Sequence, residues 1–243
     1  MRIGIIGTGA IAAAVVEGIA GDGHRITVSE RSRTRSGDLA ARFPNVTVAD
    51  NQAAIDASDV VLIGLMADAA RDVLASLRFR EGQRVVSLMA DVTLDDIAPI
   101  VAPAVAAVVM IPFPAISNGG SPILTFGDTA LIEDLAGHRN TVVPVATEAE
   151  LGAYMAAQSV ASGAALVVAE AKRWLAPQVG DPEAADAFLR RLVTSAFDAQ
   201  GAEEVLSSLD TPGGYNQRMR NALQGAGTAD VLHATFDRLS GNS

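Results

Sequence analysis

Hydrophobic and polar positions follow two different patterns along the chain, and the change falls near Pro144. Before that point, short apolar runs alternate with segments whose apolar residues recur every three to four positions, which predicts strands alternating with helices. The expected strands are residues 2–6, 25–29, 46–48, 59–65, 84–88, 107–111 and 121–126. The expected helices are residues 10–21, 37–43, 69–77 and a segment that begins after Thr93. This order favours an α/β fold with a Rossmann-type, doubly wound parallel sheet.

Beyond Pro144 the pattern is helical throughout. Thr147-Glu-Ala-Glu150 has the form of a capping box, which opens a long helix running to about residue 175. Asp181-Pro182 marks a second helix start, with Asp as N-cap and Pro in the first turn. Shorter helices are expected at residues 203–209, 215–223 and 228–239, with a turn over residues 210–214. We therefore expect a dinucleotide-binding domain over residues 1–146 and a smaller all-α domain over residues 147–243.

The expected helix 147–175 is rich in Gly, Ala and Ser. Small side chains let another backbone approach closely, so this helix is either the central helix of one domain or a helix buried between two subunits. Short helices packed around a helix of such small residues would bury little apolar surface, too little for a domain that folds alone. The second interpretation predicts a homodimer, or a larger homo-oligomer built from dimers.

The composition narrows the classes of protein that fit. The formal net charge is −10, and no basic cluster stands out beyond Arg31, Arg33 and Arg35, whereas a protein that binds a nucleic-acid backbone normally carries a basic patch. The chain has no cysteine, and its three histidines lie far apart, so no metal site is expected. The longest apolar stretch, residues 161–171, is too short to cross a bilayer, and no signal peptide is visible. We expect a water-soluble, cytoplasmic protein that binds a small molecule and neither nucleic acid nor membrane.

The first expected strand leads directly into a glycine-rich loop, Gly7-Thr8-Gly9-Ala10-Ile11-Ala12, which opens a helix. In this context the pattern indicates a nicotinamide dinucleotide site. Gly7 permits a tight turn, Gly9 lets the backbone approach the pyrophosphate, and Ala12 allows the helix to pack closely on the strand. The N-terminus of the helix then presents free N–H groups and partial positive charge to the phosphates.

The second expected strand ends in Ser29-Glu30-Arg31-Ser32-Arg33, which carries signals for both nicotinamide cofactors. An acid at this place hydrogen-bonds the ribose hydroxyls of NAD, whereas arginine and serine accommodate the extra phosphate of NADP. With Glu30 turned away, Arg31, Ser32 and Arg33 would form a phosphate cup; alternatively, the arginines are solvated loop charges. We favour NADP, with NAD as the alternative cofactor.

Segments spread over nearly the whole chain share a further resemblance. They are residues 3–19 (IGIIGTGAIAAAVVEGI), 59–63 (DVVLI), 85–94 (VVSLMADVTL) and 211–214 (TPGG). Together they resemble the pyrroline-5-carboxylate reductase family, of which this chain would be a divergent member. The most specific piece is Thr211-Pro-Gly-Gly214, which lies between two helical segments and resembles that family's Ser-Pro-Gly-Gly signature.

The resemblance implies a reaction and a set of site residues. The reaction would be reduction of the C=N bond of a small cyclic imine carboxylate, as in proline biosynthesis, by hydride transfer from NAD(P)H without a metal. The helical domain would dimerise, and the active site would lie between the two domains. The substrate carboxylate would be held by Thr211, Gly213, Gly214 and Asn216, with Tyr215 and Asn216 as catalytic candidates. Leu65, Met66, Ala90 and Pro112 would complete the cofactor site.

Several residues depart from the family pattern where the pocket is expected. Tyr215 and Asn216 replace a small residue followed by Thr, although Asn216 can still donate a hydrogen bond. Met66-Ala67-Asp68 replaces the family's Lys-Pro-Gln, and Phe113 replaces the Asn of its Met-Pro-Asn-x-Pro segment. These changes imply an altered substrate on retained cofactor machinery, because a pocket built to hydrogen-bond one substrate discriminates strongly against others.

Two other functions stay open from the sequence. One is a related NADP oxidoreductase with a different acceptor, of the deazaflavin-linked type, which would share the N-terminal loop but is not expected to carry the Thr211-Pro-Gly-Gly turn. The other is a dinucleotide-binding dimer without turnover. Arg218 and Arg220 are further candidates for a substrate carboxylate, and Asp91 for orienting or protonating an imine, although each also fits a solvated surface charge.

Overall fold

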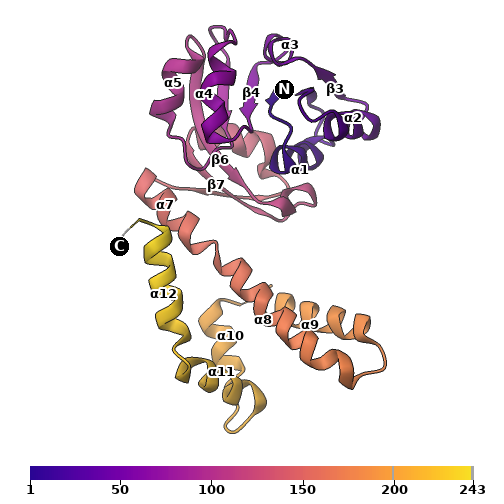
Figure 1. The fold of residues 1–243 in the computed structure, drawn as a ribbon, viewed down its shortest axis with the longest axis vertical. Coiled ribbons are helices and arrows are strands. Elements are labelled where there is room, and N and C mark those ends of the chain that lie inside the picture. The colour runs from indigo at the N-terminus through magenta and orange to yellow at the C-terminus, as the bar shows by residue number, and fades with distance from the viewer. Residues whose placement is uncertain (199, 242–243) are drawn as a thin grey trace. The chain divides into compact units, whose positions relative to one another are not determined.

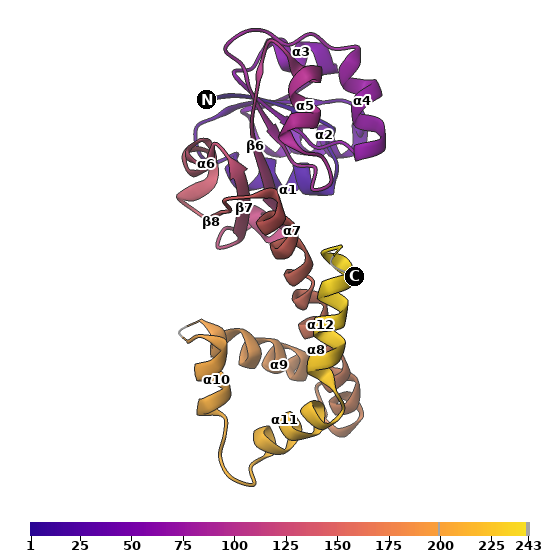
Figure 2. The ribbon, with the colours of Figure 1, turned by 90° about the vertical axis from the view of Figure 1, so that its left-hand side faces the viewer.

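The computed structural model describes residues 1–198 and 200–241 and divides into two compact units (Figure 1). The first unit is Met1–Leu151 and the second is Gly152–Ser243. The first holds a sheet with helices on both faces, and the described part of the second is helical (Figure 2).

One eight-stranded sheet forms the frame of the first unit, in the order β3-β2-β1-β4-β5-β6-β7-β8. The strands are β1 (Arg2–Ile6), β2 (Arg25–Ser29), β3 (Val46–Ala49), β4 (Val60–Ile63), β5 (Arg84–Ser87), β6 (Val105–Pro112), β7 (Pro122–Gly127) and β8 (Thr141–Pro144). All pairs from β3 to β6 are parallel. The predicted doubly wound fold is confirmed, with the winding reversing between β1 and β4.

The last two strands correct the expectation of a wholly parallel sheet. β7 pairs antiparallel to β6, and β8 then pairs parallel to β7. Only residues 113–121 join β6 to β7, and they hold a short 3₁₀ helix, η1 (Pro114–Ser117), and a turn. A parallel return needs a crossover of a dozen or more residues, so this connection reverses the strand direction instead.

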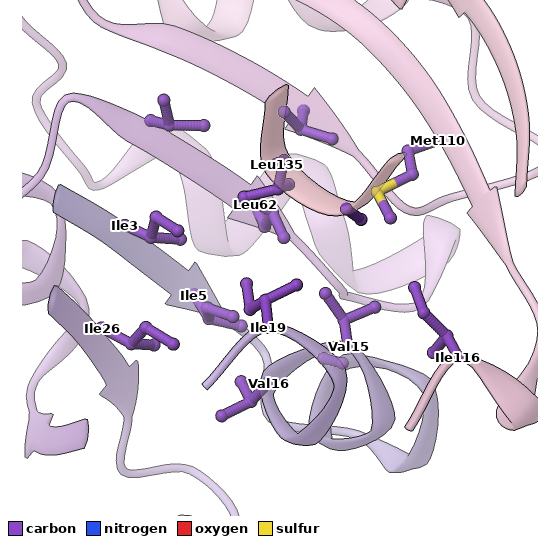
Figure 3. Packing of buried hydrophobic residues seen from close by; sticks show 14 of the residues in the cluster. Ile3, Ile5, Val15, Val16, Ile19, Ile26, Leu62, Met110, Ile116 and Leu135 are labelled. Carbon is purple, nitrogen blue, oxygen red and sulfur yellow. The ribbon is translucent and has the colours of Figure 1, made fainter. Parts of the chain in front are cut away.

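Helices cover both faces of the sheet and close two hydrophobic cores. They are α1 (Ala10–Ile19), α2 (Arg33–Arg42), α3 (Asn51–Asp56), α4 (Ala67–Ala75), α5 (Leu94–Val101), α6 (Thr129–Ile132) and the π-helical η2 (Glu133–Gly137). On β4, Leu62 belongs to the core under α1, whereas Val61 and Ile63 belong to the core under α3, α4 and α5. This alternation follows from the two-residue period of a strand buried on both faces. Figure 3 shows α1 presenting its apolar side chains to β1, β2 and β4.

Local boundaries differ from the expected ones in a few places. α2 begins at Arg33 rather than at residue 37. Neither α3 nor β8 was expected from the sequence pattern. The capping box that opens α5 is confirmed: Thr93 Oγ1 accepts from the Asp96 N–H at 3.1 Å, and Asp96 Oδ2 accepts from the Thr93 N–H at 3.3 Å. The short α3 has its own cap, because Asp50 Oδ1 accepts from the Ala53 N–H at 2.8 Å.

The C-terminal part is a series of helices. They are α7 (Glu148–Ala157), α8 (Val160–Leu175), η3 (Ala176–Gln178), α9 (Pro182–Phe197), α10 (Ala202–Ser208), α11 (Tyr215–Gly225) and α12 (Thr228–Leu239). The single helix expected over 147–175 is interrupted at residues 158–159, where Ser159 Oγ donates to the Ala156 carbonyl at 2.7 Å. Serine hydroxyls that bond back to the preceding turn compete with the helical hydrogen bonds.

Burial in the second unit is sparse. Among its described residues, only Ala156 and Val205 are buried. The expectation that the longest apolar stretch is too short to cross a bilayer is corrected, because the helical stretch Glu148–Gln178 is long and apolar enough by length and composition. Large apolar side chains of this unit, such as Leu166, Trp174 and Phe188, are exposed.

Candidate cofactor site and the Thr211–Gly214 turn

The glycine-rich loop leaves β1 where β1 and β4 run side by side. Gly7 has φ +90°, and a Cβ on it would lie 2.5 Å from the Gly64 carbonyl oxygen. A Cβ on Gly64 would in turn lie 2.9 Å from the Gly7 carbonyl oxygen. The two glycines therefore let the ends of β1 and β4 approach more closely than side chains would allow. Gly64 was missed as a site residue, although its signal is present: it follows the buried apolar run of β4.

Hydrogen bonds from the end of β2 hold this loop in place. The Gly7 N–H donates to Ser29 Oγ at 2.9 Å, and Thr8 Oγ1 donates to the Ser29 carbonyl at 2.8 Å. Both side chains are buried. Their polar atoms are thus engaged within the protein, and they position the loop from beneath.

The start of α1 has the properties of an anion site. The first helical hydrogen bond runs from the Ala13 N–H to the Gly9 carbonyl at 2.9 Å, so the N–H groups of Ala10, Ile11 and Ala12 precede it. No acidic residue lies in the first turn, and Gly9, the N-cap, has no side chain to occupy those donors. A Cβ on Gly9 would have only the Gly64 carbonyl within 4 Å, at 4.0 Å, so the space above Gly9 is open among the described residues. These features fit a dinucleotide pyrophosphate.

The start of α2 forms a second positive position at the end of β2. Ser32 is the N-cap, its side chain makes no capping hydrogen bond, and the first turn of α2 contains no acid. Glu30, Arg31 and Arg33 are exposed beside it. Because α2 begins four residues earlier than expected, the helix N-terminus itself lies within the segment proposed as a phosphate cup.

The remaining predicted cofactor residues lie on the same edge of the sheet. Leu65 and Met66 follow β4, Ala90 follows β5, and Pro112 is the last residue of β6. Since these strands run parallel to β1, their carboxyl ends meet at one edge, next to the reversal of winding. Ligands of doubly wound sheets bind at this place. Met66 is 73% exposed, whereas Pro112 is buried.

The other predicted residues form a turn within the second unit. The Gly214 N–H donates to the Thr211 carbonyl at 2.9 Å, with Pro212 and Gly213 between them. Gly213 has φ +74°, a conformation that favours glycine. Gly214 is the N-cap of α11, and a Cβ on it would lie 3.0 Å from the Thr211 carbonyl oxygen. The sequence Thr-Pro-Gly-Gly thus matches the needs of a tight turn that opens a helix.

The first turn of α11 also lacks a side-chain cap at its N-cap and lacks any acid. Its first helical hydrogen bond runs from the Arg218 N–H to the Gly214 carbonyl at 3.1 Å. The N–H groups of Tyr215 and Asn216 therefore point out of the helix start, where an anion is favoured. Both side chains are exposed, that of Tyr215 by 90%.

Comparison with known proteins supports this architecture. Residues 2–91 match a family described as NADP oxidoreductase, coenzyme F420-dependent. No curated protein matches the chain.

Solved structures match the chain over its whole length. A 1-pyrroline-5-carboxylate reductase from Streptococcus pyogenes aligns with a TM-score of 0.84 at 21% identity, covering 100% of this chain and 97% of the other. A Plasmodium falciparum pyrroline carboxylate reductase, solved with NADP bound, aligns with a TM-score of 0.84 at 11% identity, covering 100% and 96%. A reductive aminase from Aspergillus terreus aligns with a TM-score of 0.64 at 19% identity, covering 99% and 91%. The chain has the fold of the pyrroline-5-carboxylate reductases.

Proposed function

We propose that this protein is an NAD(P)H-dependent oxidoreductase that reduces the C=N bond of a small cyclic imine carboxylate. The observation that carries the proposal is the Thr211–Gly214 turn, which opens an uncapped helix in a chain whose other unit has a dinucleotide loop. The fold, matched end to end by pyrroline-5-carboxylate reductases, supports the same conclusion. A role in proline biosynthesis in the cytoplasm belongs to the proposal.

The cofactor site is formed by backbone more than by side chains. The N–H groups at the start of α1 would bind the pyrophosphate, while Ser29 and Thr8 hold the loop in place by hydrogen bonds. Leu65, Met66, Ala90 and Pro112, at the carboxyl ends of β4, β5 and β6, would border the nicotinamide. When bound, the reduced nicotinamide supplies a hydride.

The proposed substrate site is formed by the turn. The carboxylate of the imine binds the N–H groups at the start of α11, aided by the Thr211 hydroxyl and the Asn216 amide. As the imine carbon gains a hydride, its nitrogen gains a proton, and the C=N bond becomes a C–N single bond. Asn216 orients that nitrogen by a hydrogen bond, and the Tyr215 hydroxyl supplies the proton.

NADP is the preferred cofactor in this proposal, with NAD as the alternative. The start of α2, together with Arg31, Ser32 and Arg33, suits the extra phosphate of NADP. Replacing Arg31 and Arg33 with Ala should weaken NADPH binding about 10- to 100-fold, as expected for charge-assisted hydrogen bonds, and leave NADH binding unchanged. Arg35→Ala is the matched control, because Arg35 lies two positions after Arg33 on α2 and its side chain is therefore rotated about 200° away from that of Arg33. Equal losses for both cofactors would reject the preference.

We also propose that the helical unit pairs with a second copy of the chain. Exposed apolar side chains recur along α9, at Phe188, Leu192, Val193 and Phe197, and Phe188 and Leu192 lie one turn apart on the same side. So many exposed large apolar side chains on one helix are unusual for a monomer, and pairing with the same helix of a second copy under twofold symmetry would cover them. The sparse burial of this unit favours the same interpretation, because its described part has little core of its own.

A deazaflavin-linked NADP oxidoreductase is the second candidate, and the match of residues 2–91 favours it. That match covers the dinucleotide loop and ends before the helical unit. It therefore bears on how the cofactor is bound more than on which acceptor is reduced.

The deciding experiment is oxidation of NADPH and NADH by the purified protein against a panel of cyclic imines, with and without a carboxylate. Turnover of a carboxylate-bearing imine is the expected result. Tight cofactor binding without turnover of any imine would reject the proposal and favour a non-catalytic dinucleotide-binding dimer. Turnover only with a deazaflavin would favour the second candidate.

A further inference from the structure

A hydrogen-bonded network ties together the two sides of the Thr211–Gly214 turn. Asp210 Oδ1 accepts hydrogen bonds from Gln217 Nε2 at 2.9 Å and from Arg220 Nη2. Arg220 Nη1 also donates to the Leu206 carbonyl at 2.9 Å. Gln217 Oε1 accepts from the Gly213 N–H at 2.8 Å. The end of α10, the turn and the first two turns of α11 are thus joined through three side chains, those of Asp210, Gln217 and Arg220, which we name the turn clamp.

The turn clamp fixes a segment that has little else to fix it. The turn lies on the surface and contains two consecutive glycines, so its backbone has more conformational freedom to lose than that of other residues. Gly214 provides no side-chain cap. Gln217 stands at the third helical position, where a capping-box side chain reaches back to the N-cap N–H. Here it reaches one residue further, to Gly213, and the N–H groups of Tyr215 and Asn216 receive no side-chain cap because the N-cap is glycine.

The turn clamp also controls the charge beside the turn. An isolated carboxylate at Asp210 would repel an anionic substrate bound at the start of α11. The Gln217 amide and then Arg220 lower the pKa of Asp210, so this carboxylate stays ionised and paired. Arg220 offsets its charge, and the partial positive charge of the helix start is left for the ligand. Arg220, a candidate carboxylate ligand from the sequence, is instead engaged with Asp210 and Leu206.

We propose that Asp210, Gln217 and Arg220 are positioning residues that hold the turn in the conformation that binds the substrate carboxylate. This inference rests on the proposed function, since it assigns the turn to the carboxylate of the imine. The three residues act through the backbone of the turn and do not touch the reacting atoms.

The first test compares substrates with and without a carboxylate. Arg220→Met should raise KM for a carboxylate-bearing cyclic imine ~10-fold, equivalent to about 1.4 kcal/mol, with kcat and the KM for NADPH unchanged. A cyclic imine without a carboxylate should show no change in KM. Arg220→Lys should restore part of the loss, because lysine keeps the charge but not the two-pronged geometry. Arg173→Met is the matched control, because it removes an exposed arginine paired with Glu170 on α8.

The second test needs no turnover. Hydrogen–deuterium exchange at residues 210–218 should be ~10-fold faster in Arg220→Met and Gln217→Leu than in wild type or Arg173→Met, because the turn would open more often. Unchanged exchange would overturn the turn clamp. Faster exchange with unchanged KM for the carboxylate-bearing imine would overturn its positioning role. Wild-type protein that reduces no imine would reject the proposed function, while the exchange measurement would still judge the turn clamp.

Discussion

Gly7 and Gly9 lie two residues apart in one loop, yet the structure gives them different tasks. Replacing each by Ala should therefore separate folding from cofactor binding. Gly7 has φ +90°, and an added Cβ would meet the backbone of Gly64 at 2.5 Å. Gly9 has φ −77° and ψ −175°, which any residue adopts, and an added Cβ would meet only the Gly64 oxygen at 4.0 Å.

The magnitudes follow from these geometries. In Gly7→Ala, the positive φ costs about 1–2 kcal/mol and the clash with rigid backbone about 1–3 kcal/mol more. A loss of roughly 2–5 kcal/mol is a large part of the total stability of about 5–15 kcal/mol, and lowers Tm by roughly 4–20 °C. In Gly9→Ala, stability should change by less than about 1 kcal/mol. The added methyl group would, however, occupy the approach of the pyrophosphate and weaken NADPH binding about 10- to 100-fold.

Two measurements on the same purified variants suffice. Thermal unfolding without cofactor gives the change in Tm, and titration with NADPH, followed by calorimetry, gives the change in affinity. Gly9→Ala with wild-type affinity would show that the pyrophosphate does not approach the loop at this residue. Gly7→Ala with wild-type Tm would show that the close approach of β1 and β4 is not what requires glycine there.

Three further predictions concern stability and assembly. Ser29→Ala should lower the free energy of unfolding by about 1–3 kcal/mol in a denaturant titration, because it leaves the buried Gly7 N–H without an acceptor; unchanged stability would count against that hydrogen bond. Burial, followed by the N-terminal ammonium, lowers the pKa of His24 below 6.5, so the folded protein keeps this ring neutral while the unfolded chain protonates it. Stability should therefore be complete above about pH 6.5 and decline below it, less so in His24→Gln, and equal pH profiles for the two proteins would contradict the assignment. Light scattering should give a dimer for the wild type at micromolar concentration and a monomer for Phe188→Asp combined with Leu192→Asp; a monomeric wild type would refute the proposed pairing.

Local patterns in the sequence were sufficient for much of the fold. β1, β2 and α12 begin and end where the pattern places them, and the Asp181 cap of α9 accepts from the Ala184 N–H at 3.0 Å as expected. The spacing of hydrophobic residues, the helix caps and the turn residues depend only on neighbouring positions in the sequence. These elements can therefore be predicted without knowing what they pack against. The glycine-rich loop belongs to the same class, because its signal is a strand, two glycines and a helix start in sequence.

Other features depend on contacts between distant segments. β7 runs antiparallel to β6 because the connection between them is too short for a crossover. α2 begins at Arg33, although the polar residues 33–36 gave no helical pattern. Gly64 acquires its role only because β4 lies beside β1, where its backbone meets that of Gly7.

The sequence by itself therefore determined the class of fold, the cofactor loop and the turn that opens α11. Only the tertiary structure decided that the Ser29 side chain accepts a hydrogen bond from the loop at Gly7, and that Arg220 is paired with Asp210. The physical reason is that hydrogen bonds and close backbone approaches join residues by their positions in space. A one-dimensional pattern shows which groups are present, whereas the fold determines which of them are already satisfied and which remain free for a ligand.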